Sequence, residues 1–391
     1  MLNMKSIHPA AASLMEVMND LNEAGHEAHL VGGAVRDALM GRTVKDLDIS
    51  TSARPEAVME LFEEKGFAVH PTGIGHGTVT VLVEDEPFEI TTWRRDVVTD
   101  GRRAVIAFAD NMADDAFRRD LTINALYADR HGQVLDPTGQ GLDDLEKKRL
   151  RFVGDATQRI HEDALRILRF FRFHSSLGVP LEDGDGVRAC VQSAGLVRFL
   201  SRERIGMEML KLLTGTTAGA VLKSMMEKGV ANDLLPGCTY QSDEIYGLFN
   251  RLDHACTALD IKRGIVVTLA ALMEEAPIAS YRLPLKVAKS IDAVRDASAG
   301  HAGPEELGYR LGTPEGLSAL AVRYAIQCPF TVLDRDAVIR GSEQVFPVKA
   351  KDLGPEFKGK DIGVELRRLE REWILSGFRS PATDIKEDMS P

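Results

Sequence analysis

The sequence lacks several features that define whole classes of protein. Its four cysteines, Cys190, Cys238, Cys256 and Cys328, lie far apart without paired spacing, so neither a disulfide scaffold nor a zinc site is indicated. No apolar run approaches the ~20 residues that span a bilayer. The N-terminus also lacks a basic region followed by a long apolar stretch, and it is too acidic and Arg-poor for a transit peptide. We therefore expect a cytoplasmic protein without a membrane partner.

The composition is otherwise that of an ordinary globular protein. Apolar residues make up 44%, charged residues 27% and aromatic residues 6% of 391 residues. At ~100 to 200 residues per domain, this length predicts two to four domains. The net charge of −11 argues against a chain that coats nucleic acid indiscriminately, although local basic patches can still bind phosphate.

Hydrophobic periodicity divides the chain into a mixed α/β part and a helical part. A hairpin is expected where an acidic turn, residues 84–87, separates two strand-like runs. Beyond about residue 156 apolar side chains recur at helical spacing, and few β-rich runs occur. The elements expected before that point are helices over residues 11–24 and 114–127, and strands over residues 28–31, 46–50, 78–83, 88–92 and 133–135.

A pair of glycines lies where the first strand should pass into a helix. Gly32 and Gly33 follow the strand-like run 28–31 and precede Arg36. Glycines there let backbone N–H groups approach an anion, and a helix N-terminus adds a favourable dipole. A plain tight turn would look the same.

Two aspartates are spaced to share one face of a strand. Asp46 and Asp48 are two residues apart, so their side chains project to one side while Leu47 faces the core. Adjacent carboxylates repel, and oxygen ligands suit Mg²⁺, which takes one or two carboxylates plus substrate phosphates. Glu89 could point to the same face if the two strands are neighbours. The alternatives are an accidental surface pair and, for Glu89, a solvated strand carboxylate.

Five stretches resemble, in the expected order, motifs of the class II CCA-adding enzymes and bacterial poly(A) polymerases, within the nucleotidyltransferase superfamily. The resemblance is specific over residues 28–215 and general beyond them. The five are Gly32-Gly33 with Asp46-Leu47-Asp48, then Arg118 to Leu126, Asp136 to Leu145, Arg159 to Arg169 and Ser201 to Ile205.

This resemblance implies a fold and a division of the chain. It implies a palm-like α/β head with a mixed sheet, followed by an all-α neck, body and tail. The implied bounds are 1–155 for the head, 156–235 for the neck with its base-recognition motif, 236–335 for the body and 336–391 for the tail. The helical half would grip the acceptor arm of tRNA by shape and phosphate contacts.

The resemblance also implies the chemistry of the head. Two Mg²⁺ ions held by Asp46 and Asp48, with Glu89 beside them, would activate the tRNA 3′-hydroxyl for in-line attack on the α-phosphate and stabilise the leaving pyrophosphate. Gly32, Gly33 and Arg36 would meet the triphosphate. Arg119 and Asp120, expected on a helix with Asn124 one turn on, would bind phosphate and ribose. For Arg36 a salt bridge to Asp37 is the alternative.

Asp163 and Arg166 are three residues apart and are expected as neighbours on one helix face. A carboxylate accepts from the exocyclic amine of cytosine or adenine, and a guanidinium donates to the adjacent ring nitrogen. Guanine and uracil present the opposite groups, so this pair would select C and A. An ordinary intrahelical salt bridge is the alternative. Arg169 and Arg172 continue the same side, as further nucleotide contacts or as a solvated basic face.

The polar stretch 95–104 resembles the flexible loop that the family uses when adenosine is added. It includes Asp100, Gly101 and Arg102, and it is not shortened as in enzymes that add only two cytidines. That favours complete CCA addition, although a plain connecting loop would look similar.

The sequence therefore predicts a template-independent enzyme that builds or repairs the 3′ CCA end of tRNA from CTP and ATP, with release of pyrophosphate. Its partners would be tRNA and the two nucleotides, and no DNA is expected. A bacterial poly(A) polymerase, a partial enzyme adding only A or only CC, and a non-catalytic RNA-binding relative are the alternatives.

Overall fold

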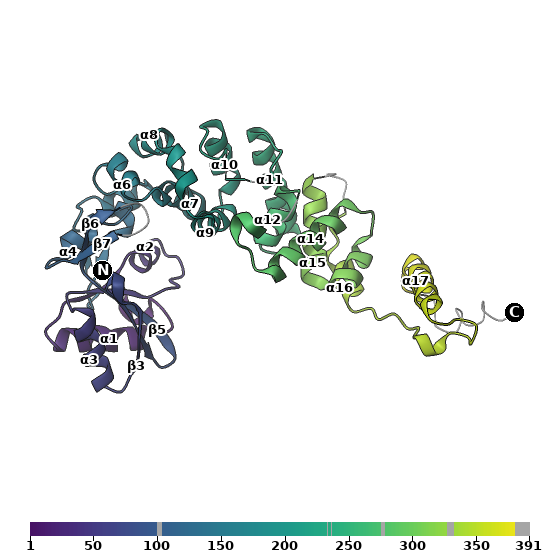
Figure 1. The fold of residues 1–391 in the computed structure, drawn as a ribbon, viewed down its shortest axis with the longest axis horizontal. Helices are drawn as coiled ribbons and strands as arrows, with labels where there is room; N and C mark the ends of the chain where they lie inside the picture. The colour runs from purple at the N-terminus through teal and green to yellow at the C-terminus, as the bar shows by residue number, and fades with distance from the viewer. Residues whose placement is uncertain (100–103, 233, 236, 275–277, 327–331, 380–391) are drawn as a thin grey trace. The chain divides into compact units, whose positions relative to one another are not determined.

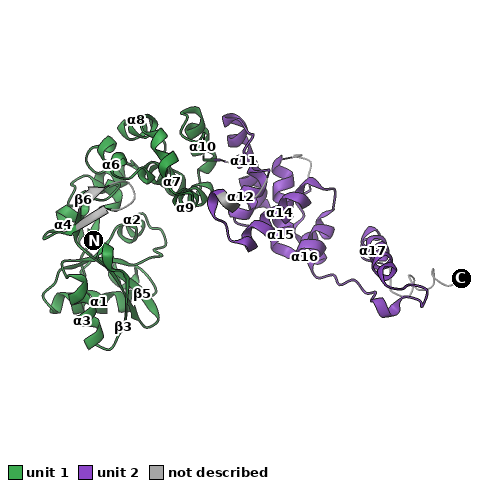
Figure 2. Cartoon of the chain, in the orientation of Figure 1, with its two compact units in different colours: residues 1–234 green, residues 235–391 purple. Residues whose placement is uncertain are grey.

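The computed structural model describes residues 1–391 except 100–103, 233, 236, 275–277, 327–331 and 380–391. The chain forms two compact units, residues 1–234 and residues 235–391 (Figure 2). The finer division into head, neck, body and tail stays a prediction.

A mixed seven-stranded sheet forms the centre of the head, as predicted (Figure 1). Its strand order is β3-β4-β5-β2-β1-β8-β9, and β2 with β5 is its parallel pair. β4 and β5 form the expected hairpin. The strands are β1 (Ala28–Val31), β2 (Asp48–Thr51), β3 (Ala68–Gly73), β4 (Thr78–Val83), β5 (Glu86–Thr92), β8 (Tyr127–Ala128) and β9 (Val134–Leu135).

Helices cover one face of this sheet because the strands alternate apolar and polar residues. On β4, Val79, Val81 and Val83 are buried and the residues between them are not. They pack in one core with Leu14 of α1 (Ala11–Glu23) and Phe62 of α3 (Pro55–Glu64). Burying each such side chain contributes about 1.5 to 3 kcal/mol. This packing fixes β2 and β5, the central strands that carry Asp48 and Glu89.

One expectation for the head is wrong in detail. The helix expected over 114–127 ends early: α4 spans Met112–Phe117 and is followed by a turn and the 3-10 helix η3 (Thr122–Asn124). Leu121 is extended because it bridges to Phe152, and Tyr127 pairs with Val31 of β1.

Two antiparallel strands lie on either side of the residues of the predicted flexible loop. They are β6 (Arg94–Thr99) and β7 (Ala104–Phe108). The role of the stretch 95–104 in adding adenosine stays a prediction.

Beyond residue 155 all regular elements of the described residues are helices, as predicted. None of these or the other described helices is long and apolar enough to cross a membrane. The remaining helices of residues 1–234 are η1 (Met4–Ser6), α2 (Gly33–Leu39), η2 (Ile74–His76), α5 (Gly141–Glu146), α6 (Ala156–Glu162), α7 (Leu165–Leu177), α8 (Asp185–Gln192), η4 (Ala194–Phe199), α9 (Arg202–Leu213) and α10 (Ala218–Glu227). Those of residues 235–391 are α11 (Ser242–Ala258), α12 (Ile265–Leu272), α13 (Ile278–Tyr281), α14 (Leu285–Ala299), α15 (Pro304–Ile326), α16 (Arg335–Ser342), η5 (Ala350–Asp352) and α17 (Lys360–Leu375).

A buried histidine lies on the apolar face of α7. His174 is 3% exposed, its ring lies against that of Phe170 at 4.7 Å between centroids, and its Nδ1 lies 3.0 Å from the carbonyl oxygen of Val179. Burial lowers the pKa of His174 to about 4, despite the neighbouring carbonyl groups. The imidazole is therefore neutral in the folded protein at neutral pH.

This burial predicts that the protein loses stability in mild acid. The pKa of His174 is lower folded than unfolded, so below the unfolded value of 6.5 the unfolded chain binds the extra proton and stability falls towards pH 4. Between pH 7 and pH 5 the wild type should lose about 2 kcal/mol more than His174→Asn, from about 1.4 kcal/mol per pH unit. Urea unfolding followed by circular dichroism measures the difference. The exposed His70→Asn on β3 is the matched control, and equal losses in wild type and His174→Asn would contradict the assignment.

Candidate active site

The parallel pairing of β2 with β5 brings two predicted acidic residues face to face. Asp48 is the direct register partner of Glu89. Asp46 lies just before β2, and both aspartates are exposed while Leu47 and Ile49 are buried. The condition set for Glu89 is met, since its strand is the neighbour of β2. The three carboxylates thus lie together at the central strand pair β2–β5, and we call this group the acidic edge.

The neighbouring carboxylates make ionisation of Asp48 less favourable. Partial burial, the charge of Glu89 and the charge of Asp46 raise the pKa of Asp48 to about 6, against the opposing effect of Arg119. Within the part of the chain that the structure describes, no basic side chain forms an ion pair with Asp46, Asp48 or Glu89. Acidic side chains that have no ion-pair partner, and whose charge Arg119 offsets only in part, suit a cation.

The donor set fits a divalent metal shared with a substrate. Over the described residues, no three or more histidine, cysteine or acidic side chains are grouped as a complete metal cage. Asp46 and Asp48 offer carboxylate oxygens alone, which hard cations such as Mg²⁺ prefer, and Mg²⁺ commonly completes its shell with water and phosphate oxygens. The two aspartates are therefore the residues that would hold such an ion.

The glycine turn lies directly beside an arginine. Gly32 has φ +70°, a left-handed conformation that glycine adopts without strain, and α2 begins at Gly33. A Cβ atom at Gly32 would lie 3.3 Å from NH1 of Arg119. Because Arg119 also acts electrostatically on Asp48, the turn, the arginine and the acidic edge form one site.

Arg119 and Asp120 lie in the turn after α4, so their expected place on a helix is wrong. The guanidinium of Arg119 is 5.3 Å from the centroid of the Tyr127 ring and donates through Nε to the Tyr127 hydroxyl at 3.1 Å. Its NH2 donates to Asp115 at 3.0 Å. Asp115 is fully buried, and these contacts fix Arg119 in the turn.

Arg36 is buried and bonded on both sides. Its Nε donates to Asp37 at 2.9 Å, and its NH1 donates to the side-chain oxygen of Asn124 at 2.5 Å. The guanidinium also lies 5.1 Å from the ring centroid of Phe173 in α7. The salt bridge to Asp37, named as the alternative, is present. Contact of Arg36 with a triphosphate stays a prediction.

Asp120, Asn124, Arg169 and Arg172 belong to the same buried network. Asn124 donates to Asp120 at 3.0 Å, and Arg169 donates to the other oxygen of Asp120 at 2.7 Å. Glu208 of α9 pairs with Arg172 at 2.6 Å and lies 3.8 Å from Arg169. Burial opposes ionisation of Asp120, but Arg169 and Asn124 outweigh it and hold its pKa well below the ordinary value. The structure thus joins these predicted residues to one another, and their contacts with a nucleotide stay predictions.

Asp163 and Arg166 do not share one helix, contrary to expectation. Asp163 has an extended backbone at the end of α6, and Arg166 lies in the first turn of α7. Asp163 pairs with Arg204 of α9 at 2.6 Å. Arg166 pairs with Glu162 at 2.7 Å and donates to the carbonyl oxygen of Arg118 at 3.0 Å. The side chains of the predicted base-reading pair therefore form ion pairs with two different partners, Arg204 and Glu162.

The predicted loop residues Asp100, Gly101 and Arg102 lie outside the described residues.

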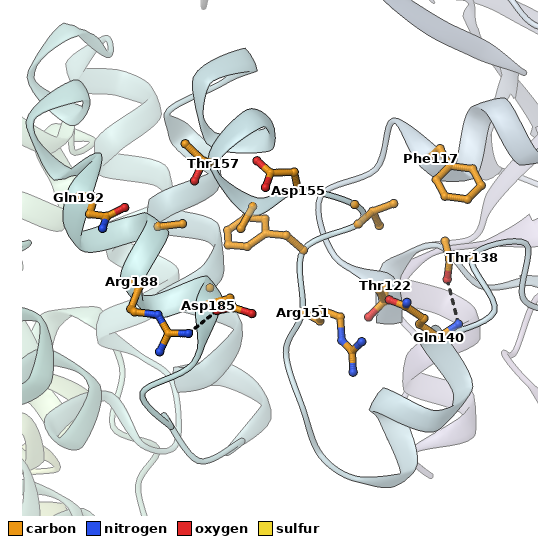
Figure 3. Close-up of a pocket in the computed structure, with 16 residues that line it drawn as sticks. Phe117, Thr122, Thr138, Gln140, Arg151, Asp155, Thr157, Asp185, Arg188 and Gln192 are labelled. Atoms are coloured by element: carbon orange, nitrogen blue, oxygen red, sulfur yellow. Dashed lines mark hydrogen bonds and ion pairs between the residues drawn. The ribbon is translucent and has the colours of Figure 1, made fainter.

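A cavity of about 540 Å³ lies between the head segments and helices α6 and α8, and no residue of the acidic edge lines it (Figure 3). Arg151, Gln140 and Gln192 are among its lining residues, and none of the predicted nucleotide-binding residues lines it. We therefore do not place the nucleotide there.

Sequence reasoning missed the contacts of three residues of the site. Asp115 precedes Arg118 and Arg119 by three and four residues, a spacing that signals ion pairs on a helix. Arg204 lies in the predicted motif Ser201 to Ile205, but its contact with Asp163 was not predicted. Neither this contact nor that of Glu208 with Arg172 follows from a local pattern, because each joins α9 to an element far away in the sequence.

The mixed sheet, glycine turn and acidic edge define a nucleotidyltransferase head, and comparison with known proteins specifies the family. Residues 28–151 match the family described as "Poly A polymerase head domain", and residues 185–241 match "Probable RNA and SrmB- binding site of polymerase A". The CCA-adding enzyme of Bacillus subtilis is 33% identical over 366 residues, covering 92% of this chain and 90% of the relative. That of Geobacillus thermodenitrificans is 36% identical over 327 residues, covering 75% and 79%.

A solved structure matches the whole fold. The crystal structure of the Bacillus stearothermophilus CCA-adding enzyme in complex with CTP is 29% identical, covers 94% of each chain and has a TM-score of 0.78. The Thermotoga maritima CCA-adding enzyme complexed with tRNA shares the fold at 18% identity, covers 97% of this chain and 94% of its own, and has a TM-score of 0.67. The chain belongs to the family of CCA-adding enzymes, which are tRNA nucleotidyltransferases that use divalent metal.

The close approach of Gly32 to Arg119 predicts a defect from one methyl group. Gly32→Ala strains a left-handed turn and displaces Arg119, so kcat/KM for CTP should fall roughly tenfold to a hundredfold, the cost of a small misplacement in a site. Gly41 has a similar φ of +65° with nothing within 4 Å, so Gly41→Ala controls for strain alone. Steady-state kinetics on a tRNA lacking CCA provide the measurement, and equal values for the two variants would contradict this role of the turn.

Proposed function

We propose that this protein builds and repairs the 3′-terminal CCA of tRNA from CTP and ATP without a nucleic acid template. The observation that carries the proposal is the acidic edge, where Asp48 faces Glu89 with Asp46 and Arg119 close by. The edge is intact in a chain whose relatives, named CCA-adding enzymes, match it over most of its length.

The reaction joins one nucleotide at a time to the tRNA end. The 3′-hydroxyl oxygen of the tRNA forms a bond to the α-phosphorus, and the bond from that phosphorus to its bridging oxygen breaks to release pyrophosphate. The backbone N–H of Gly33, at the start of α2, and the guanidinium of Arg119 would neutralise and orient the triphosphate. The N–H of Gly32 donates to the carbonyl oxygen of Leu126 at 3.0 Å, so Gly32 would serve by its conformation and its lack of a side chain. This chain therefore contributes mainly position and charge.

Mg²⁺ is the metal that we propose for the acidic edge. Held by Asp46 and Asp48, with Glu89 adjacent, it would lower the pKa of the attacking hydroxyl and stabilise the charge on the leaving pyrophosphate. The exposed carboxylates and the raised pKa of Asp48 support this proposal, because a bound cation would offset both the partial burial and the repulsion by Glu89 and Asp46 that raise this pKa. A divalent ion also serves the two nucleotides equally, since both bring the same triphosphate.

Base selection would fall to Asp163 and Arg166. Asp163 and Arg166 lie on different elements, and each is oriented by its own partner, Arg204 for Asp163 and Glu162 for Arg166. The template role requires only that both side chains reach the same base. The carboxylate would accept from the amine of cytosine or adenine, and the guanidinium would donate to the ring nitrogen. Arg36, Asp120, Asn124, Arg169 and Arg172 would support this nucleotide pocket as one network of hydrogen bonds and ion pairs.

The remaining parts of the chain would serve the tRNA. We propose that the helical residues beyond 155, the tail 336–391 included, bind the acceptor arm through shape and phosphates. The stretch 95–104, which includes Asp100, Gly101 and Arg102, would act when adenosine is added. Its substrates place the protein in the cytoplasm.

Extension of a tRNA transcript that lacks CCA tests the proposal. With Mg²⁺ we expect two added residues from CTP alone, a stop at three from CTP with ATP, and no extension from GTP or UTP. Asp46→Ala should lower the rate by roughly a hundredfold to a thousandfold, as for loss of one group that stabilises transition-state charge, and should leave tRNA binding intact. Glu60→Ala, an exposed acid on α3, is the control.

The same gel separates the second candidate. The head matches a family described as a poly(A) polymerase head, so a long ladder of A residues from ATP is the outcome that would replace CCA addition with poly(A) synthesis. No extension at all would favour a non-catalytic RNA-binding protein. Full activity of Asp46→Ala would overturn the assignment of the acidic edge.

A further inference from the structure

Asp115 is a completely buried carboxylate that collects hydrogen bonds from three elements. One oxygen accepts from Nε of Arg118 at 2.8 Å. The other accepts from Arg119 at 3.0 Å, from the Tyr127 hydroxyl at 2.7 Å and from the Ser50 hydroxyl at 3.3 Å. Its exposed fraction is 0%. No nucleotide can touch this carboxylate, so any effect it has on the reaction must pass through its partners.

The carboxylate is charged in the folded protein. Burial alone would raise the pKa of Asp115, but Arg119 and Arg118, together with the hydroxyl of Tyr127, outweigh burial and hold the pKa far below its ordinary value. A buried charge with well-formed partners is stable, whereas removing one partner leaves the others uncompensated. The group therefore fixes the positions of both arginines.

Arg119 uses one side of its guanidinium for this anchoring. Nε donates to Tyr127 at 3.1 Å and NH2 donates to Asp115. NH1 is the nitrogen that lies beside the Gly32 turn, 3.3 Å from the place of a Cβ atom there. The Arg119 side chain keeps 18% of its surface exposed, against none for Asp115. The contacts of Nε and NH2 thus fix the guanidinium, and NH1 is left beside the Gly32 turn.

The same carboxylate reaches the strand that carries the acidic edge. Ser50, which donates to Asp115, is fully buried and lies two residues after Asp48 on β2. Asp115 therefore connects β2 to the turn that bears Arg119, across 65 positions of sequence. This contact sets the arginine at a defined place relative to Asp48.

We infer that Asp115 is a positioning residue for nucleotide binding: it holds Arg119 so that NH1 faces the phosphates of an incoming nucleotide at the Gly32 turn. The inference rests on the proposed function, since it assigns Arg119 to the triphosphate. It extends that function because the anchor serves both nucleotides through their common triphosphate and takes no part in reading the base.

Asp115→Asn tests the inference because asparagine keeps the shape and removes the charge. The KM for CTP and the KM for ATP should rise together, by about tenfold, the scale for hydrogen bonds to charged groups. The KM for tRNA and the preference for C and A over G and U should stay unchanged. Asp114→Asn is the matched control, because it removes an equal charge from the same turn of α4 without a described side-chain partner.

A purely structural role of Asp115 would give a different pattern. Loss of folded enzyme would lower kcat in proportion to the inactive fraction and leave the KM of the remaining enzyme unchanged. That result, or a rise in KM for one nucleotide alone, would overturn the inference. Should Asp115→Asn fail to fold, Tyr127→Phe decides: it removes one donor to Asp115 and one acceptor of Arg119, so it loosens the same anchor and should raise both nucleotide KM values about threefold. Unchanged values would overturn the inference.

A double-mutant cycle with Arg119→Ala separates this inference from the proposed function. If Asp115 acts through Arg119, Asp115→Asn should add no further rise in nucleotide KM on the Arg119→Ala background. Additive effects would contradict action through Arg119. A normal KM in Arg119→Ala alone would remove Arg119 from the triphosphate and leave CCA addition by the wild type standing. Failure of the wild type to extend tRNA would instead remove the proposed function.

Discussion

The parallel pairing of β2 with β5 sets two carboxylates directly opposite each other, and the rest of the site is organised around that repulsion. Asp48 and Glu89 occupy partnered positions, and among the described residues neither forms an ion pair with a basic side chain. Partial burial, with the charge of Glu89, raises the pKa of Asp48 to about 6. Like charges at such positions destabilise a sheet. We propose that a metal ion that arrives with a nucleotide would relieve this repulsion.

Opposite charges inside the head position the groups that we propose to contact the nucleotide. Asp115 anchors Arg119, and Asp120 anchors Arg169, each carboxylate buried and bonded to more than one donor. Removing one partner from such a pair costs several kcal/mol, about 3 to 5, because it leaves a buried charge uncompensated. The turn of residues 118–120, which follows α4, therefore holds its shape without a regular helix. The arginines stay fixed while the acidic edge stays open.

The sequence predicted the parts of the site that follow local rules. Alternation identified the common face of Asp46 and Asp48, and the glycine pair identified the strand-to-helix turn. The helix expected over 114–127 was wrong because the bridge of Leu121 to Phe152 and the pairing of β8 outweigh helical periodicity. β3 was also missed, since its residues are mostly exposed and show no clean alternation.

The base-reading pair shows a second limit of local rules. A spacing of three residues predicts neighbours on a helix, yet the extended backbone of Asp163 separates α6 from α7. Its partner Arg204 lies on α9, 41 positions away, and only the folded chain reveals that contact. Buried networks between distant elements have no signature in one sequence.

The position of the bound nucleotide, measured in a crystal structure of the protein with CTP and Mg²⁺, is the most direct test of the proposed site. We expect the triphosphate between the Gly32 turn and Arg119, with metal ions on Asp46 and Asp48. A triphosphate in the cavity beside Gln140 and Arg151, or metal ions bound away from the two aspartates, would contradict it.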